Sequence, residues 1–222
     1  MGRFSDVLFD LDGTVTDPFD GIAGCIRHAM RCMGLEPPSG DEMRGAIGPP
    51  LRQTFGRLLA SAEANRIEDA MRLYRERYSV TGLFENEVYP GLPDLLANLN
   101  RAGCRLFLAT SKPSVYAQRI VDHFELGEHF AGVYGSELDG RLENKSDLLR
   151  FLLDKERLKA DATAMVGDRG QDIVAAKTHS LSAVGVTWGY GSSGELAAAG
   201  ADVMCSSPAE LFQFLTEASR SR

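Results

Sequence analysis

Six short and almost continuously apolar runs determine most of what this chain can fold into. They are VLFD (7–10), RLFLATS (105–111), AGVYGS (131–136), TAMVGD (163–168), SAVGVTW (182–188) and ADVMCS (201–206). Strands that are buried on both faces read as continuous apolar runs, whereas a strand with one wet face alternates apolar and polar residues. The six runs therefore predict strands of a parallel sheet that is covered on both faces.

Helical patterns lie between most of these runs. Segment 92–103 places four leucines on one face and ends at Gly103, a residue type that commonly follows a helix. Segment 112–124 carries Pro113 where the first turn of a helix tolerates it, and segment 145–158 is amphipathic. Strands that alternate with helices predict an α/β fold with a doubly wound parallel sheet.

A region without strand patterns follows the first run. Between Pro18 and Phe84, segments 20–34 and 66–78 carry apolar residues at helical spacing. The tetrapeptide SGDE (39–42) has the spacing of a capping box, which marks the start of a helix. The region therefore predicts an all-helical insert after the first strand.

The chain leaves this insert near YPGLPD (89–94), whose prolines and glycine indicate a hinge followed by a helix. We therefore expect two domains. Residues 1–16 and 85–222 would form the core domain with the parallel sheet, and residues 17–84 would form a small all-helical domain.

Charge and hydropathy narrow the range of partners. The 222 residues carry a formal net charge of −7, which argues against a nucleic-acid partner. No apolar stretch approaches the roughly 20 residues that span a bilayer, and no apolar leader precedes the first run. The four cysteines have neither zinc-site nor disulfide-framework spacing. We expect a cytoplasmic protein without membrane partners, as a monomer or a homodimer.

Polar residues stand where the predicted strands end. In an open parallel sheet, ligands bind beyond the carboxyl ends of the strands. The residues at those ends are Asp10 and Asp12, Thr110 and Ser111, and Asp168, with Asp172 in the first turn of the next helix. Several carboxylates with only oxygen ligands favour a hard cation, and Mg²⁺ is the expected one.

Lys145 adds a second indication of a site, because it opens the helix that begins NKSDLL. A cation at a helix N-terminus opposes the helix dipole, and local rules broken in this way often mark functional positions. A lysine directed at the carboxylate cluster would neutralise part of its charge and could hold a phosphate group.

Four segments carry a resemblance to a known family. DLDGT (10–14), LATSK (108–112), NKSD (144–147) and MVGDRGQDI (165–173) resemble the ordered motifs of the haloacid dehalogenase-like hydrolase superfamily. The helical insert resembles the small cap domain of that superfamily, so the resemblance covers nearly the whole chain. It implies a Rossmann-like core with a helical cap. Segments such as IGPPLRQTF and VTWGYGS are similar to the phosphoglycolate phosphatase-like branch.

The resemblance implies a Mg²⁺-dependent phosphomonoester hydrolase that works through an aspartyl-phosphate intermediate. Asp10 would attack phosphorus, and Asp12 would protonate the leaving oxygen and later activate the hydrolytic water. Mg²⁺ would be held by Asp10, Asp168, Asp172 and the backbone carbonyl of Asp12. Asp172 also has a second interpretation, as an ordinary first-turn acid favoured by the helix dipole.

The transferring phosphoryl group would be held by Thr110, the Ser111 amide and Lys145. Arg52, which follows the GPP loop of the insert, is a candidate to bind an anionic group of the substrate, although it can also be a solvated side chain. A cap that covers the site implies a small phosphorylated metabolite as substrate. Phosphoglycolate is the first expectation, followed by nucleoside 5′-monophosphates.

Other activities share parts of this pattern. A phosphosugar mutase would carry the same four motifs, and only its products would separate it from a phosphatase. A dehalogenase would not need Asp12 or the pair Asp168 and Asp172. A phospho-receiver module would not place its acceptor aspartate on the first strand. A catalytically silent scaffold would not need Asp10, Asp12 and Lys145 together.

Overall fold

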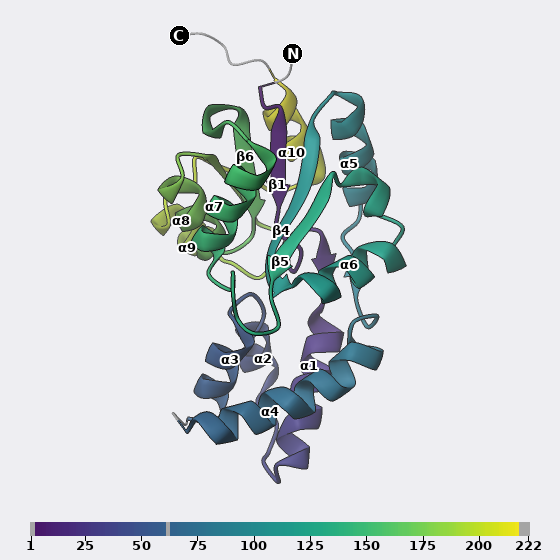
Figure 1. Cartoon of the computed structure of the whole chain (residues 1–222), viewed down its shortest axis with the longest axis vertical. Coiled ribbons are helices and arrows are strands. Elements are labelled where there is room, and N and C mark those ends of the chain that lie inside the picture. Colours follow the sequence, from purple (N-terminus) through teal and green to yellow (C-terminus); the bar gives the residue numbers. More distant parts are fainter. Residues whose placement is uncertain (1–2, 61–62, 218–222) are drawn as a thin grey trace. The chain divides into compact units, whose positions relative to one another are not determined.

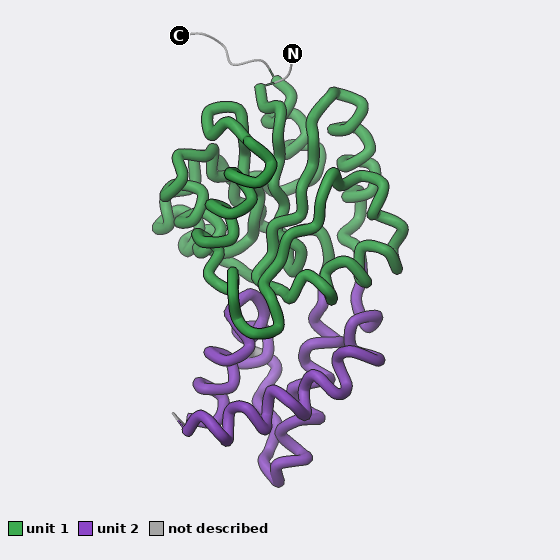
Figure 2. The backbone as a smooth tube through the Cα atoms, viewed as in Figure 1, with its two compact units in different colours: residues 1–16, 88–222 green, residues 17–87 purple. Residues whose placement is uncertain are grey.

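The structure is a computed structural model, which describes residues 3–60 and 63–217. Two compact units divide these residues (Figure 2). The first, here called the sheet unit, runs up to Thr16 and resumes at Val88, while the second, here called the helical unit, spans Asp17–Glu87. Among the described residues, no helix is both long and apolar enough to cross a bilayer.

A six-stranded parallel sheet forms the centre of the sheet unit (Figure 1). Its order is β5-β4-β1-β6-β7-β8, with β1 next to β4 and β6. The strands are β1 (Asp6–Phe9), β4 (Arg105–Pro113), β5 (Gly132–Ser136), β6 (Thr163–Gly167), β7 (Ser182–Val186) and β8 (Val203–Cys205). All six predicted strands are therefore confirmed.

Helices cover both faces of this sheet (Figure 1). Helices α7 and α8 pack against each other and against the strands on one side, and α5 packs with α10 on the other. The bounds are α5 (Leu92–Arg101), α6 (Ser114–His123), α7 (Lys145–Glu156), α8 (Gly170–Thr178), α9 (Ser193–Ala198) and α10 (Pro208–Thr216), with short 3₁₀ turns η2 (Gly127–His129) and η3 (Ala160–Ala162). The predicted doubly wound α/β fold is confirmed.

The core explains why the runs lack alternation. Leu8, Phe107 and Met165 on the three central strands are fully buried in one cluster with residues of α7 and α8. Their strand neighbours Phe9 and Leu108 are equally buried, because the second layer of helices covers the other face. Both faces of a covered parallel sheet must be apolar.

One element boundary was predicted wrongly. We expected Lys112 and Pro113 to begin a helix, but both belong to β4 and the helix starts at Ser114. The ladder between β4 and β5 shifts register after Thr110 and pairs again at Pro113 with Ser136. Pro113 has an extended backbone, which lets it end a strand as well as precede a helix. This extension of β4 places Lys112 at the site described below.

The helical unit packs its helices around an apolar core that includes Ile26, Phe55 and Met71. Its elements are α1 (Phe19–Cys32), α2 (Gly40–Arg44), α3 (Leu51–Leu58), α4 (Ala64–Arg77) and the π-helical turn η1 (Tyr78–Gly82). The helices expected over 20–34 and 66–78 are thus present. Two short strands that no sequence pattern predicted, β2 (Thr16–Asp17) and β3 (Glu87–Val88), pair with each other.

Candidate active site

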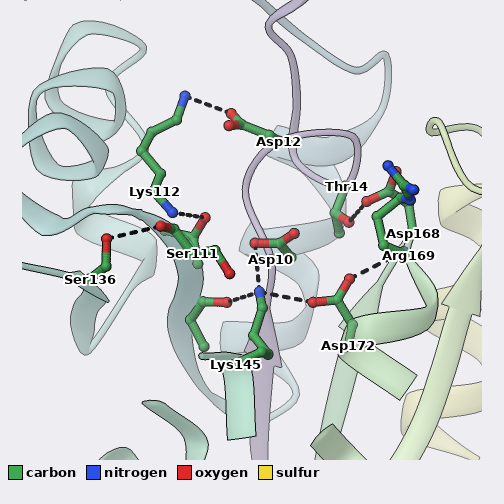
Figure 3. A network of polar contacts seen from close by, with 12 residues as sticks. Asp10, Asp12, Thr14, Ser111, Lys112, Ser136, Lys145, Asp168, Arg169 and Asp172 are labelled. Atoms are coloured by element: carbon green, nitrogen blue, oxygen red, sulfur yellow. Dashed lines mark hydrogen bonds and ion pairs between the residues drawn. The ribbon is translucent and has the colours of Figure 1, made fainter. Parts of the chain in front are cut away.

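The sheet order brings the sequence-predicted residues of the sheet unit together. Strands β4, β1 and β6 are neighbours, so their carboxyl ends lie at one edge. This edge and the helices that follow it carry Asp10, Asp12, Thr110, Ser111, Lys112, Lys145, Asp168 and Asp172. Figure 3 labels all of these except Thr110. Asp10 is 3% exposed and Asp172 is inaccessible, so their charges need partners inside the protein.

Lys145 lies at the centre of this group. Its Nζ is 2.9 Å from Asp10 Oδ1 and 2.8 Å from Asp172 Oδ1, and it donates a hydrogen bond of 2.8 Å to the carbonyl of Ala109 (Figure 3). Burial lowers the pKa of Lys145, but the carboxylates of Asp10 and Asp172 more than offset this and raise it. The ammonium therefore stays charged and holds the two carboxylates on either side of it.

The start of α7 explains how a lysine can occupy this unfavourable position. Asn144 caps the helix, and its Oδ1 accepts hydrogen bonds from the backbone N–H groups of Ser146 at 2.9 Å and Asp147 at 3.3 Å. The first amides are therefore satisfied locally. Lys145 is the first residue of the helix, and its buried side chain enters the carboxylate cluster as the sequence predicted.

Asp172 lies in the first turn of α8, as expected. Its Oδ2 accepts a hydrogen bond of 3.1 Å from the backbone N–H of Arg169, and its Oδ1 faces Lys145. The residue therefore acts as a first-turn acid and also reaches the cluster with Asp10. The two interpretations left open by the sequence are compatible in this geometry.

Asp168 is held by a loop far away in the sequence. Its Oδ1 accepts a hydrogen bond from Thr14 Oγ1 at 3.3 Å, and its Oδ2 accepts one from the backbone N–H of Tyr190 at 2.8 Å. Trp188 Nε1 donates to the carbonyl of Thr14 at 3.0 Å. The loop after β7 therefore contacts both Asp168 and the loop that follows β1.

Gly13 brings the loop after β1 against Asp168. Its φ is +84°, and a Cβ added to it would lie 2.3 Å from Asp168 Oδ2. Gly103 has a similar φ of +89° with no atom within 4 Å of such a Cβ. The two positions share the backbone conformation that favours glycine, but only Gly13 leaves no room for a side chain.

We expect Gly13→Ala to be more damaging than Gly103→Ala. The control should cost about 1 kcal/mol of unfolding free energy from the left-handed backbone alone. Gly13→Ala should cost at least about 1 kcal/mol more, because Asp168 must move. Urea unfolding measures the loss of unfolding free energy in both variants. Calorimetric titration with Mg²⁺ should show weaker binding only for Gly13→Ala. Equal costs and equal Mg²⁺ affinity in the two variants would contradict this role of Gly13.

Asp12 turns away from Asp10 to a different partner. Its Oδ1 lies 2.8 Å from Nζ of Lys112 (Figure 3). Lys112 is the last residue of the LATSK motif and was not predicted as a site residue. Burial raises the pKa of the Asp12 carboxyl, and Lys112 opposes this shift without cancelling it. No sequence signal separated Lys112 from a helix-start lysine, because its position depends on the extension of β4.

Thr110 and Ser111 lie on β4, which pairs with β1 and has Leu108 opposite Phe9. Thr110 Oγ1 accepts a hydrogen bond of 3.2 Å from the backbone N–H of Lys112, and Ser136 Oγ donates one of 2.9 Å to the Ser111 carbonyl (Figure 3). The Ser111 hydroxyl oxygen is buried and has no hydrogen-bond partner among the residues that the structure describes. The strand end is therefore fixed and still offers a hydroxyl group.

Arg52 belongs to the helical unit, where it is the second residue of α3. It forms an ion pair with Glu68 of α4, and both side chains are half exposed. Exposed ion pairs contribute about 0–1 kcal/mol, so this contact is easily exchanged. Its role in substrate binding stays a prediction.

The donor set at the strand ends fits a divalent cation. Asp10, Asp168 and Asp172 each offer a carboxylate oxygen within 4.8 Å of the others. Lys145 pairs its ammonium with two of these three carboxylates, Asp10 and Asp172, so the four side chains together carry an excess of two negative charges when all are ionised. Oxygen ligands of this kind suit Mg²⁺. The side chain of Asp12 is outside this group, and its expected contribution through the backbone carbonyl stays a prediction.

The acidity of the carboxyls reflects the same excess of charge. Burial, together with the carboxylates of Asp172 and Asp10, raises the pKa of Asp168 to about 8. Burial also raises the pKa of Asp172 to about 6, although Lys145 opposes the shift. A bound cation would favour the ionised forms and reverse these shifts.

Comparisons with known proteins agree with this arrangement. The family model described as "Haloacid dehalogenase-like hydrolase" matches residues 7–186. A protein of Pseudomonas aeruginosa named 5'-nucleotidase is 43% identical over 96% of both chains. Tyrosine-protein kinase PtkA of Mycobacterium tuberculosis is 40% identical over 83% of this chain and 62% of its own length.

A phosphoglycolate phosphatase of Vibrio parahaemolyticus is 28% identical over 93% of this chain and 94% of its own. The crystal structure of a predicted phosphatase from Clostridium acetobutylicum superimposes with a TM-score of 0.90 at 36% identity, covering 95% of this chain and 97% of that one. The match of the family model covers β4 to β7, all of β1 except Asp6, and all the carboxylates of the site. The chain belongs to the haloacid dehalogenase-like hydrolase family.

Proposed function

We propose that this phosphatase hydrolyses small phosphomonoesters with Mg²⁺ and a phosphoaspartate intermediate on Asp10. One observation carries the proposal: two carboxylates two residues apart have different lysine partners. Asp10 lies beside Lys145 within the group that suits a cation, and Asp12 lies beside Lys112. Two neighbouring carboxyl groups in different environments are suited to different roles, one as a nucleophile and one as an acid.

In the first step, a carboxylate oxygen of Asp10 would form a bond to phosphorus as the bond to the ester oxygen breaks. The electron pair of the broken bond would pass to the ester oxygen, which would take the proton of the Asp12 carboxyl group. The products of this step are a neutral alcohol, a phosphorylated Asp10 and an ionised Asp12.

In the second step, a water molecule would attack the phosphorus atom and give its proton to the Asp12 carboxylate. The bond from phosphorus to Asp10 would break, which releases inorganic phosphate and restores the Asp10 carboxylate. The Asp12 carboxyl would again carry a proton for the next cycle.

Asp10, Asp168 and Asp172 would hold the Mg²⁺ ion, with the Asp12 backbone carbonyl as an expected further ligand. When bound, the ion would supply positive charge that offsets the repulsion between a carboxylate and a phosphate. Lys145, Thr110 and the Ser111 amide would donate hydrogen bonds to the phosphoryl oxygens. Lys145 is well suited to this because it stays charged, and its charge is already directed at Asp10.

Removal of divalent metal should stop the reaction. Phosphate release is measured from a panel of nucleoside 5′-monophosphates, phosphoglycolate and sugar phosphates, in a chelator and after Mg²⁺ is restored in excess. We expect release only with Mg²⁺, because the unbalanced carboxylates would repel a phosphate. Release at the same rate in the chelator would contradict the metal site.

The names of the relatives support an order of substrates that reverses our first expectation. The relative named 5'-nucleotidase is 43% identical, whereas three relatives named phosphoglycolate phosphatase are 28% to 30% identical. We therefore rank nucleoside 5′-monophosphates before phosphoglycolate in the panel. A phosphosugar mutase would instead return an isomerised sugar phosphate with little free phosphate, so product analysis of the same reactions tests that alternative.

A further inference from the structure

Lys112 is a buried lysine that the proposed reaction does not yet use. Its side chain is 6% exposed, and its Nζ lies 2.8 Å from Oδ1 of Asp12, whose side chain is 12% exposed. Moving an ammonium out of water costs several kcal/mol unless a partner of opposite charge compensates. The ionised form of Asp12 supplies such compensation, and Oδ1 can still accept a hydrogen bond from Lys112 when the carboxyl group carries a proton on its other oxygen. Each side chain therefore restricts where the other can point.

The backbone at Lys112 is held in place independently of this ion pair. The N–H of Lys112 donates to Thr110 Oγ1 at 3.2 Å, within the register shift of β4. On the neighbouring strand, a Cβ added to Gly135 would lie 2.3 Å from the Lys112 carbonyl oxygen. The close approach of the two strands therefore requires glycine at 135, and it fixes the point from which the Lys112 side chain extends.

The two buried lysines of the site form ion pairs with different carboxylates (Figure 3). Lys145 contacts Asp10 and Asp172, which belong to the group that suits a cation. Lys112 contacts Asp12, whose side chain lies outside that group. Asp10 and Asp12 are only two residues apart, so without a separate partner Asp12 could turn towards Lys145.

We propose that Lys112 is a positioning residue that holds the Asp12 carboxyl group where it can transfer its proton to the leaving oxygen. The inference rests on the proposed function and goes one step further, since it assigns the orientation of Asp12 to a named side chain. Lys112 itself neither forms nor breaks a bond in this scheme. The consequence of losing it should therefore depend on how much the leaving group needs a proton.

The test uses a series of substituted phenyl phosphates whose phenols differ in acidity. For each ester, kcat/KM reports the steps up to release of the phenol and excludes the later hydrolysis of the phosphorylated enzyme. Lys112→Met should steepen the decrease of kcat/KM with increasing pKa of the phenol, because the charge on the leaving oxygen is no longer offset by a proton. General acid catalysis contributes about 10²–10⁴-fold. We expect kcat/KM for the ester with the poorest leaving group to decrease by a factor at least about ten times larger than kcat/KM for the ester with the best one.

Three further variants make the result specific. Lys177→Met removes an exposed lysine of the same unit that is paired with Asp202, and it should leave the dependence unchanged. Lys112→Arg keeps the positive charge beside Asp12, so kcat/KM should depend on the pKa of the phenol almost as it does in wild type. Asp12→Asn should steepen it as well, and adding Lys112→Met to Asp12→Asn should steepen it no further, because the two residues act as one unit.

Lys112→Gln is measured as a second variant beside Lys112→Met. The dependence of kcat/KM on the pKa of the phenol is determined for every variant that unfolds at the wild-type temperature. A uniform loss for all esters would overturn the inference and assign Lys112 to substrate binding or folding. An unchanged dependence would overturn it as well. If wild type hydrolyses none of the esters, or Asp10→Asn remains active, the proposed function fails together with the inference. If Asp12→Asn steepens the dependence of kcat/KM on the phenol pKa and the Lys112 variants do not, only the role of Lys112 is overturned.

Discussion

Asp10→Asn is expected to abolish phosphate release while the protein stays folded. An amide oxygen is a poor nucleophile, so the covalent step cannot begin. Loss of a nucleophile in other enzymes that work through covalent intermediates lowers kcat by on the order of 10⁴-fold or more. The substitution also removes one carboxylate from a group of three in which a single ammonium, that of Lys145, is paired with Asp10 and Asp172. The unfolding temperature without metal should therefore not decrease.

Asp154→Asn is the matched control, because Asp154 is an exposed residue of α7 away from the strand ends. It should keep wild-type activity and stability. Both variants are assayed for phosphate release and for thermal unfolding. Substantial Mg²⁺-dependent release by Asp10→Asn would contradict the assignment of the nucleophile. An inactive but unfolded Asp10→Asn protein would contradict the charge balance described for the cluster.

Lys145→Met should remove both activity and much of the stability. Breaking a buried ion pair by removing one partner costs about 3–5 kcal/mol, because the other charge is left uncompensated. Here two carboxylates, those of Asp10 and Asp172, would lose the same ammonium. Mg²⁺ at the same carboxylates should recover part of the loss, since a ligand that binds only the folded state stabilises it. Urea unfolding with Mg²⁺ and with a chelator measures both effects.

Lys177→Met again provides the comparison, because Lys177 is 44% exposed and its ion pair with Asp202 lies at the surface. Such pairs contribute about 0–1 kcal/mol. The gain in stability from Mg²⁺ should be larger in Lys145→Met than in this control or in wild type. If Lys145→Met and Lys177→Met unfold at the same urea concentration, Lys145 does not compensate the buried carboxylates.

The sheet and most of the site could be predicted from the sequence because both depend on local patterns. A strand covered on both faces has to be apolar throughout, so the runs around Leu8, Phe107 and Met165 identify the central strands. In a parallel sheet the carboxyl ends of neighbouring strands meet at one edge. Residues that follow those runs, such as Asp10 and Asp168, therefore had to lie near each other.

The contacts that were missed depend on tertiary geometry. Lys112 looked like the start of a helix, and it meets Asp12 only because β4 continues through a register shift to Pro113. The hydrogen bond from Trp188 to the Thr14 carbonyl joins residues 174 positions apart in the sequence. No periodicity or turn signal encodes such a pair. Arg52 follows a loop and lies in the first turn of α3, and a single arginine at such a place carries no pattern beyond its charge.

The most direct test of Asp10 as the nucleophile is to trap the phosphorylated enzyme. Asp12→Asn is mixed with p-nitrophenyl phosphate and Mg²⁺, quenched with acid and digested for mass spectrometry. The good leaving group needs no proton for the first step, and the missing base should slow the second step, so the intermediate should accumulate. We expect a phosphoryl group on Asp10. A burst of nitrophenol with the phosphoryl group on another residue, or on none, would contradict it.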